Sequence, residues 1–367
     1  MKSGNLIILH DDDGRIYYHA LELAAHRLGI TCFYRESRIA HKIIRIIIGR
    51  ASPSSGCWSQ TFKNLSFRLK IPFLQDQTIL LGMAPLDWRI LLYSHLCKKN
   101  RVIYSNSWPE WHKNNFPRPC PFYLKGAVLR CWLKFLSSPH VQIVAVSSPV
   151  KTSILTWLRP FVPKTSVIPH CVHHAFLATQ NDVSQNTGSF HRVILCGRLR
   201  PEKGIEIYIE LAKAYPELEF HLVGDGPLRE RVSLECQKRP NLFWHGYMSN
   251  KKQLAELFQQ CDVLLNPALK IPGWEELFGM VLIEAMACGL IVVSSAHVGP
   301  KQLITPMDNG LLCSDGTFDD FSNALLQIRA MPESERIAMR NRAKLYAHNF
   351  SEDVISSRWG EILQGSP

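Results

Sequence analysis

The chain has 367 residues, of which 46% are hydrophobic and 20% are charged. This balance excludes an intrinsically disordered chain, and the length favours two domains over a single hydrophobic core. No apolar run reaches the roughly 18 residues that are needed to span a bilayer. The eleven cysteines are scattered without a C-x-x-C pair, which favours free thiols in a reducing compartment, so we expect a cytoplasmic protein.

Positive charge is concentrated in the first half of the chain. The formal net charge is +11, and residues 1–180 hold 23 Lys and Arg against 8 Asp and Glu, whereas the remainder holds 19 against 23. The first half therefore faces an anionic partner. Nucleic acid and the anionic surface or phosphate head group of a lipid both fit this charge, but no nucleic-acid motif accompanies it. We expect no nucleic-acid partner, and a peripheral position on the inner face of the cytoplasmic membrane.

Strands and helices alternate through the first half. Residues 6–9 read as a strand, 18–28 as a helix and 31–34 as the next strand, and such a βαβ unit implies parallel strands. The alternation continues to about Thr179. Further strands are expected at 79–81, 102–104 and 141–146, and further helices at 87–98 and 123–136.

A polar turn with three consecutive aspartates follows the first expected strand. An Asp-x-Asp pair can hold a divalent cation, but such a pair would be expected beside the phosphates of a ligand and not behind the first strand. A second interpretation is that Asp13 and Gly14 line a ligand-binding cleft, with Asp13 on the acceptor side. An ordinary polar turn is the third interpretation.

Residues 39–48 combine isoleucines at helical spacing with His41, Lys42 and Arg45. The positive charge continues at Lys63, Arg68 and Lys70. Such a segment can lie in a membrane interface, attracted to anionic lipids by about 1 kcal/mol for each basic residue near the surface. A partly buried helix with a solvated basic edge fits the pattern equally well.

The polar segment 178–191 has no apolar period, and the charge balance changes sign there, so we place the domain boundary in it. The first domain is expected at residues 1–178, the second at 190–349 and a C-terminal helical segment at 350–367. In the second domain, strands are expected at 192–196, 219–223, 242–244, 263–266, 290–294 and 309–312. Helices are expected at 205–214, from 228, and at 254–261, 280–288 and 353–363.

Two glycine-containing loops follow strands of the second domain. The run GRLRPEKG at 197–204 brings Arg198 and Lys203 into one loop, where two cations can neutralise a diphosphate. Basic residues in a loop are otherwise simply solvated. In the run GDGP at 224–227, the glycines allow either close approach of the backbone to a ligand or a tight turn.

A third motif, EELFGMVLIEAMACG at 275–289, places Glu276 and Glu284 eight residues apart, on either side of Gly279. A glycine turn that leads into a helix exposes backbone N–H groups that can hold a phosphate. One carboxylate can then meet a sugar near the helix mouth while the other binds a ribose hydroxyl. The alternative is an amphipathic helix with two solvated glutamates.

Together these three motifs resemble the retaining nucleotide-sugar glycosyltransferases of family 4, the bacterial cell-surface polysaccharide type. The resemblance is specific over roughly residues 190–315. It implies the α/β GT-B fold, in which two Rossmann-like domains with parallel sheets face each other across a cleft. The first domain would then bind the acceptor, the second the nucleotide sugar, and residues 350–367 would cross back to the first domain.

The resemblance also implies site residues. Arg198, Lys203 and Glu276 form the expected catalytic set. The expected donor-binding set is Gly14, Gly197, Gly224, Gly226, Tyr247, Phe278, Gly279, Met280, Val281 and Glu284. The family often has a histidine after the strand at 102–104; this chain has none there, and the nearest imidazole, His112, is with Asp13 the acceptor-side candidate.

The implied reaction moves a hexose-type sugar from a nucleotide diphosphate sugar to a glycan acceptor, with retention of configuration and without a metal or other cofactor. The basic first half favours a lipid-linked acceptor, as in the assembly of lipopolysaccharide, O-antigen, capsule or exopolysaccharide. The alternatives are a catalytically silent GT-B subunit that binds a nucleotide sugar, and an epimerase or phosphorylase of the same fold.

Overall fold

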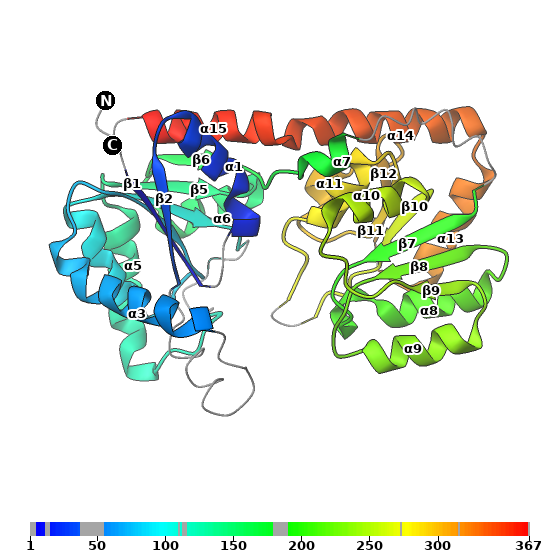
Figure 1. The fold of residues 1–367 in the computed structure, drawn as a ribbon, viewed down its shortest axis with the longest axis horizontal. Helices are drawn as coiled ribbons and strands as arrows, with labels where there is room; N and C mark the ends of the chain where they lie inside the picture. Colours follow the sequence, from blue (N-terminus) through cyan, green and yellow to red (C-terminus); the bar gives the residue numbers. More distant parts are fainter. Residues whose placement is uncertain are drawn as a thin grey trace. The chain divides into compact units, whose positions relative to one another are not determined.

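The computed structural model describes residues 5–11, 15–36, 55–108, 111, 116–178, 190–271, 274–314 and 316–365 (Figure 1). The chain forms two compact units: unit 1 comprises Met1–His170 and Ile355–Pro367, and unit 2 comprises Cys171–Val354. Each unit contains one six-stranded sheet. Of the segments singled out in the sequence, 39–48 and all but the ends of 178–191 lie outside the described residues.

The sheet of unit 1 is parallel, with the strand order β2-β1-β3-β4-β5-β6. Its strands are β1 Asn5–His10, β2 Thr31–Glu36, β3 Thr78–Gly82, β4 Arg101–Asn106, β5 Val141–Ala145 and β6 Thr165–Val167. Its helices are α1 Arg15–Arg27, α3 Ser55–Lys70, η1 Ile71–Phe73, α4 Ile90–Tyr93, η2 Ser94–Lys98, η3 Phe122–Leu124, α5 Lys125–Leu136 and α6 Ser148–Leu158. Runs of buried aliphatic residues form the central strands, as expected for a parallel sheet that is covered on both faces.

The helix expected at 87–98 is wrong in its extent, because the structure has α4 at Ile90–Tyr93 followed by the 3₁₀ helix η2. Asp87 is the cause. Its carboxylate accepts the backbone N–H of Arg89 at 2.9 Å and pairs with the Arg89 guanidinium at 2.5 Å, so residues 87–89 form a turn. Aspartate competes in this way with the helical hydrogen bonds of the backbone.

The sheet of unit 2 is also parallel, with the order β12-β11-β10-β7-β8-β9. Its strands are β7 Arg192–Cys196, β8 Glu219–Val223, β9 Leu242–Trp244, β10 Val263–Asn266, β11 Ile291–Ser295 and β12 Gly310–Cys313. Its helices are α7 His174–Leu177, η5 Pro201–Lys203, α8 Ile205–Ala214, α9 Arg229–Lys238, α10 Lys251–Gln259, α11 Met280–Ala287, α12 Pro300–Leu303, α13 Phe318–Ala330, α14 Glu333–Ala347 and η6 His348–Phe350. The last helix, α15 Glu352–Gln364, begins in unit 2 and ends in unit 1.

Sequence patterning predicts the strands of this second unit closely, because they are short, mostly apolar and bounded by loops. The expected strands at 192–196, 219–223, 242–244 and 263–266 agree with β7, β8, β9 and β10 to the residue. Buried Tyr208 of α8 fixes the centre of the sheet: its hydroxyl lies 3.0 Å from the carbonyl oxygen of Val193 in β7 and 2.7 Å from that of His221 in β8.

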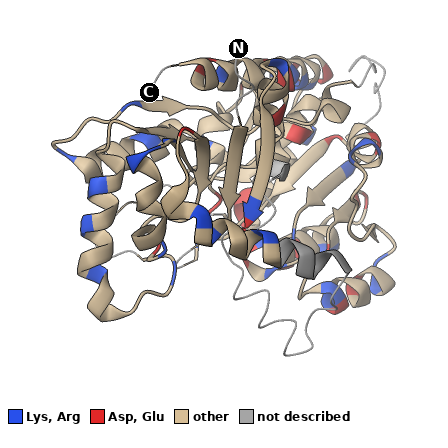
Figure 2. Ribbon diagram, turned by 60° about the vertical axis from the view of Figure 1, so that its left-hand side comes forward, with Lys and Arg blue, Asp and Glu red and all other residues tan. Residues whose placement is uncertain are grey.

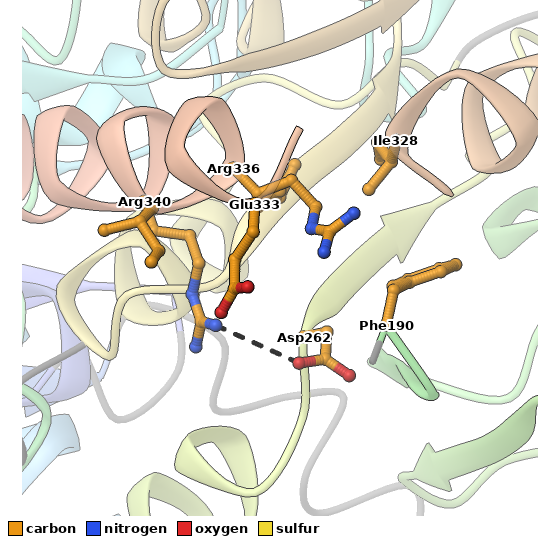
Figure 3. A pocket seen from close by; sticks show the side chains of 8 residues that line it. Phe190, Asp262, Ile328, Glu333, Arg336 and Arg340 are labelled. Atoms are coloured by element: carbon orange, nitrogen blue, oxygen red, sulfur yellow. Dashed lines mark ion pairs between the residues drawn. The ribbon is translucent and has the colours of Figure 1, made fainter. Parts of the chain in front are cut away.

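A small cavity lies at the amino end of the second sheet (Figure 3). There the Asp262 carboxylate accepts the backbone N–H groups of His191 and Arg192, and it lies 3.9 Å from the Arg340 guanidinium. Arg340, which α14 carries, also donates a 2.6 Å hydrogen bond to the carbonyl of Gly289. Since these groups satisfy one another, the cavity is part of the framework, and ligands of such sheets bind at the opposite, carboxyl edge.

Among the described residues, none of the helices combines the length and the apolar character that crossing a bilayer requires.

Candidate functional site

The loops that carry the sequence motifs leave the second sheet at its carboxyl edge. The strand order reverses between β7 and β10, which pair in parallel. The loops after these two strands therefore begin side by side and then continue in opposite directions. Such a switch point is where open parallel sheets bind ligands. The topology therefore brings together the loop 197–204 and the loop 267–279, which are about seventy residues apart in the sequence.

The loop after β7 is held in place by buried contacts at both ends. Leu199 is fully buried, and the carbonyl of Glu202 accepts the backbone N–H of Leu269 at 2.9 Å. Gly204 ends η5 with φ +68°, and a Cβ at this position would lie 1.8 Å from the carbonyl oxygen of Pro267. Only glycine combines that left-handed conformation with so close an approach.

Within this held loop, the two predicted cations differ in their surroundings. The Arg198 side chain is exposed, and it makes no hydrogen bond or ion pair within the part of the chain that the structure describes. The Lys203 Nζ instead lies 2.5 Å from Oε2 of Glu276, and the two side chains are only 17% and 16% exposed. Lys203 also lies over the Trp274 ring, 5.0 Å from its centroid. The structure thus joins two of the three predicted catalytic residues.

A residue that the sequence analysis missed, His297, positions Glu276. The Nδ1 atom of His297 accepts the backbone N–H of Glu276 at 3.2 Å, so the ring proton is on Nε2, which donates to the carbonyl of Ala268 at 2.8 Å. His297 is buried, and the next residue, Val298, donates its N–H to the Glu275 carboxylate at 3.0 Å. The one signal in the sequence was its position two residues after the end of β11, a strand of the parallel sheet.

Helix α11 begins at the same edge. Gly279 precedes it in the left-handed region, and the first N–H groups of the helix, at Met280 and Val281, have no acceptor within the helix itself. Helix dipoles and free N–H groups favour an anion at such an end. Phe278, which was expected to bind the donor, is buried beneath the turn, where its side chain holds the backbone in place.

Glu284 lies in the second turn of α11 and is 6% exposed. Burial raises the pKa of its carboxyl group, while the nearby Lys251 acts in the opposite direction. The Lys251 Nζ lies 2.9 Å from Glu284 Oε1 and 5.4 Å from the centroid of the Phe176 ring. The interpretation of two solvated glutamates is therefore wrong for this helix, because both side chains pair with a lysine.

The glycines of the 224–227 run bring neighbouring loops together. A Cβ on Gly224 would lie 1.8 Å from the carbonyl oxygen of Gly197, and one on Gly226 would lie 2.6 Å from that of Leu199. Gly224 also donates its N–H to the carbonyl of Gly246 at 2.8 Å. These contacts fix the loops after β7, β8 and β9 against one another, and they leave the side chain of the following residue, Tyr247, 73% exposed.

The acceptor-side candidates Asp13 and His112, and the donor candidate Gly14, lie outside the described residues. Of the aspartate triplet, Asp11 is described, and it is buried. Its two carboxylate oxygens lie 2.7 Å from Arg89 and 2.9 Å from Arg118. Because each oxygen already pairs with an arginine, we interpret Asp11 as part of the framework of unit 1 and not as a cation ligand.

A group of aromatic residues that the sequence analysis did not select lies at the carboxyl end of β1. The His10 ring is 6.0 Å from Tyr17 and 5.7 Å from Tyr18, and the Tyr17 ring is 5.3 Å from His170. Burial lowers the pKa of His170 to about 4, so this imidazole is neutral at pH 7. The strand order of unit 1 reverses between β1 and β3, which makes this edge the ligand-binding end of that sheet.

Comparison with known proteins agrees with this architecture. Residues 180–346 match the family model "Glycosyl transferases group 1". An uncharacterized glycosyltransferase of Methanocaldococcus jannaschii is 25% identical over 60% of this chain and 59% of its own length. A GDP-mannose-dependent phosphatidylinositol dimannoside mannosyltransferase of Mycobacterium tuberculosis is 30% identical over 42% of this chain and 40% of its own. The matched region thus spans about half the length of these curated relatives.

Solved structures extend the likeness in fold to nearly the whole chain. Anabaena HepE in complex with UDP has a TM-score of 0.69 at 16% identity, covering 98% of this chain and 99% of that one. Sucrose-phosphate synthase from Thermosynechococcus elongatus has a TM-score of 0.70 at 17% identity, covering 98% of each chain. Residues 180–346 are therefore similar to the group 1 glycosyl transferases, and the α/β fold of the chain, with two parallel six-stranded sheets, is GT-B.

Proposed function

We propose that this protein is a retaining glycosyltransferase that moves a hexose-type sugar from a nucleotide diphosphate sugar to a glycan acceptor. The observation that carries the proposal is the contact between Lys203 and Glu276, 2.5 Å apart at the switch point of the second sheet and next to the start of α11. A cation, a carboxylate and free helix N–H groups there match the three parts of a sugar diphosphate: phosphate charge, sugar hydroxyls and phosphate oxygens.

In the proposed reaction, negative charge grows on the departing diphosphate. Arg198 and Lys203 stabilise that charge, and the N–H groups of Gly279, Met280 and Val281 bind the phosphate oxygens. The bond between the anomeric carbon and the phosphate oxygen breaks. The acceptor hydroxyl forms the new glycosidic bond from the same face and gives its proton to an oxygen of the departing phosphate, so configuration is retained and charge is balanced.

The two glutamates bind the two sugars of the donor, one the transferred sugar and the other the ribose. Glu276 accepts hydrogen bonds from hydroxyls of the transferred sugar, and its pairing with Lys203 holds the carboxylate in place. Glu284 accepts from the ribose, with Lys251 beside it. Because two side-chain cations and a helix start provide the positive charge for the diphosphate, we propose that the reaction needs no metal ion.

The acceptor that we propose is a lipid-linked glycan at an anionic membrane surface, on the cytoplasmic side. Residues 1–180 carry 23 Lys and Arg against 8 Asp and Glu, and Figure 2 marks the described ones in blue and red. Helix α3 and the turn after it expose large apolar side chains, at Phe62, Leu65, Leu69 and Phe73. Lys63 and Lys70 are exposed among them, and basic and apolar groups together favour an anionic lipid surface.

The names of two relatives support this acceptor class. One is the phosphatidylinositol dimannoside mannosyltransferase described above, and the other is an alpha-galactosylglucosyldiacylglycerol synthase of Streptococcus pneumoniae, 23% identical over 66% of this chain. Both names describe sugar transfer to, or synthesis of, a glycolipid.

The donor is identified by a thermal-shift panel of UDP, GDP, ADP and CDP sugars, followed by turnover with the best donor on lipid-linked glycans. We expect one base to stabilise the protein above the others, and NMR of the product to show the donor's anomeric configuration. A product of inverted configuration rejects retention. Consumption of inorganic phosphate, or release of an unlinked sugar, favours a phosphorylase or an epimerase, and donor binding without turnover favours a silent subunit.

Membrane association is tested separately by co-sedimentation of the full chain with vesicles. At low salt we expect binding to vesicles that contain an anionic phospholipid and none to neutral vesicles. The Lys63→Glu/Lys70→Glu variant should bind less, whereas Lys213→Glu, an exposed lysine of α8 in unit 2, should bind as the wild type does. If the wild type ignores anionic vesicles, a soluble glycan becomes the preferred acceptor.

A further inference from the structure

Two segments that are far apart in the sequence meet at one end of unit 2, where the chain passes from one unit to the other. Cys171 is the first residue of unit 2 and Val354 is the last. Val172 forms a parallel bridge with Ser351 and donates its N–H to the carbonyl of Phe350 at 2.7 Å. The residues that follow each segment, at the starts of α7 and α15, are therefore neighbours.

Three potential metal ligands converge beside this bridge: His173, His174 and Glu352. Their ligand atoms all lie within 4.8 Å of one another, and within the described part of the chain this is the single group of three His, Cys, Asp or Glu side chains so placed. The two imidazole rings stack with centroids 4.2 Å apart. The residues come from both crossing segments, so the cluster exists only in the folded unit.

The spacing of two of these ligands fits a tetrahedral ion. The Nδ1 atom of His174 lies 3.4 Å from Oε1 of Glu352. Two ligands at about 2.0–2.2 Å from a tetrahedral zinc ion are about 3.3–3.6 Å apart. The backbone N–H of His174 also donates to the same carboxylate oxygen at 3.0 Å, which holds Glu352 in place.

The third ligand is fixed by a different contact. His173 precedes α7, and in the chain without an ion its Nδ1 accepts the backbone N–H of Ala175 at 3.2 Å as the N-cap of that helix. A neutral imidazole has one lone pair, so zinc binding replaces this hydrogen bond. A groove lined by His173, His174, Asn250 and Glu256 borders the cluster and gives room for a water molecule as a fourth ligand. Three protein ligands and one water is the coordination of open zinc sites.

The ligand types select the metal. Two imidazoles and one carboxylate suit zinc and neighbouring transition metals, whereas magnesium and calcium prefer oxygen ligands alone. The cluster shares no residue with the set proposed to bind the donor, which is Arg198, Lys203, Glu276, Glu284 and the start of α11. Its metal would therefore have no part in the sugar transfer proposed above.

We propose that His173, His174 and Glu352 bind one Zn²⁺ ion that joins the two segments by which the chain enters and leaves unit 2. The ion joins the start of α7 to the start of α15, next to the bridge between Val172 and Ser351. Because the ligands come together only on folding, zinc binding stabilises the folded chain by mass action.

The test uses the full-length, tag-free protein after treatment with a chelator. Calorimetric titration with ZnCl₂ should show one ion per chain, and the melting temperature should rise with zinc concentration. X-ray absorption at the zinc edge should show nitrogen and oxygen ligands at about 2.0–2.1 Å and no sulfur shell at about 2.3 Å. The sulfur shell shows whether zinc binds at the proposed site or at any of the eleven cysteines.

Matched variants make the test specific. His173→Asn retains an N-cap side chain while it removes a ligand, and His174→Gln and Glu352→Gln remove the others with little change of shape. Each should weaken zinc binding by about tenfold or more, since even changes behind a ligand cost 10–100-fold. Glu256→Gln, which lines the same groove, should bind zinc as the wild type does.

The zinc-binding measurements either support the proposed site or contradict it. Loss of the bound ion in the ligand variants, with melting temperatures in chelator equal to that of the wild type, supports the site. Unchanged zinc stoichiometry in the His174→Gln/Glu352→Gln variant, a sulfur shell, or no binding to the wild type overturns it. Donor binding and turnover are measured on the same samples, and neither result bears on the other.

Discussion

Lys251 and Glu284 face each other from two different helices, with the Nζ of Lys251 2.9 Å from Oε1 of Glu284. The lysine is the first residue of α10 and is partly exposed, whereas the glutamate lies inside α11 and is buried. The same burial that removes water from the carboxylate also makes its ionisation unfavourable, and one lysine offsets this only in part. The proposed donor site thus contains a carboxylate whose charge opposes folding.

This relationship predicts a pH dependence. Burial raises the pKa of Glu284 above its ordinary value of 4.5, so its contribution to stability is fully present below pH 4.5 and is lost as pH rises through the raised pKa. The Glu284→Gln variant has no ionisable group at this position, so it does not lose this stability as pH rises. The melting temperature of the variant minus that of the wild type should therefore increase from pH 4 to neutral pH.

Thermal denaturation over that pH range, without ligand, measures the difference. Glu256→Gln, an exposed change on α10, should show no trend with pH. A difference for Glu284→Gln that stays constant or shrinks as pH rises contradicts the prediction. The same variant should bind the donor about 10- to 100-fold more weakly, because a hydrogen bond to a charged group contributes about 1.5–3 kcal/mol.

Removal of the phosphate-binding cations should slow transfer. We expect Arg198→Ala and Lys203→Ala each to lower kcat by about 10²- to 10³-fold, as loss of one group that stabilises developing negative charge does. Lys213→Ala, which changes an exposed lysine of α8, is the control and should leave kcat unchanged. Steady-state kinetics with the best donor measures all three.

The double variant Arg198→Ala/Lys203→Ala is the decisive one. If it binds the donor and turns over as the wild type does, the diphosphate is not bound by this loop and the proposed function is wrong. Circular dichroism checks the fold of each variant, because Lys203→Ala leaves the mostly buried Glu276 without its cation.

Gly204 and Gly246 share a left-handed φ of +68° but differ in their surroundings. Alanine at Gly246 meets nothing within 4 Å and should cost about 1–2 kcal/mol, the usual penalty of this conformation. Alanine at Gly204 would place its Cβ 1.8 Å from the carbonyl oxygen of Pro267, so the backbone has to move. We expect a loss of about 3 kcal/mol or more, as for strained and overpacked sites.

Urea denaturation compares these two glycine variants. Gly204 adjoins Lys203, so the Gly204→Ala variant should also lose turnover. This loss should occur at a concentration of urea at which the wild type is still folded. Equal unfolding midpoints for the two variants would mean that the approach to Pro267 does not limit the loop.

Substitution of Arg340 is expected to lower the stability of the protein, although this residue lies far from the proposed donor site. Its side chain is 8% exposed, lies 3.9 Å from Asp262 and donates to the carbonyl of Gly289, just beyond the end of α11 (Figure 3). Arg340→Ala leaves the partly buried Asp262 carboxylate and the buried carbonyl of Gly289 without this partner, and should destabilise the protein by about 1–3 kcal/mol.

The same helix provides the control. Arg342 pairs with Asp308, but both side chains are about half exposed, so Arg342→Ala should change stability by less than about 1 kcal/mol. The unfolding midpoints of the two variants, measured by circular dichroism, should therefore differ widely. Similar midpoints would show that the Arg340 network adds little.

The sequence alone predicted the six strands of unit 2 and the first five strands of unit 1, but not helices α7, α12, α13 and α14. Strands such as 263–266 are mostly apolar runs between loops, and α8 has clear helical spacing, so local pattern fixes both. In unit 1, the expected helix at 87–98 was broken by the hydrogen bonds of Asp87. Competition between a side chain and the backbone is decided by geometry that periodicity does not contain.

The motifs by themselves also identify Arg198, Lys203, Glu276 and Glu284 as a group, because loops that follow strands of a parallel sheet share one edge. Which of these residues are in contact depends on the fold of the whole unit. Lys203 meets Glu276 because β7 pairs with β10, and the strand order that sets this pairing depends on how all six strands and their helices pack. His297, Lys251 and the meeting of His174 with Glu352 were hidden for the same reason, since contacts between distant segments depend on the whole fold and not on local pattern.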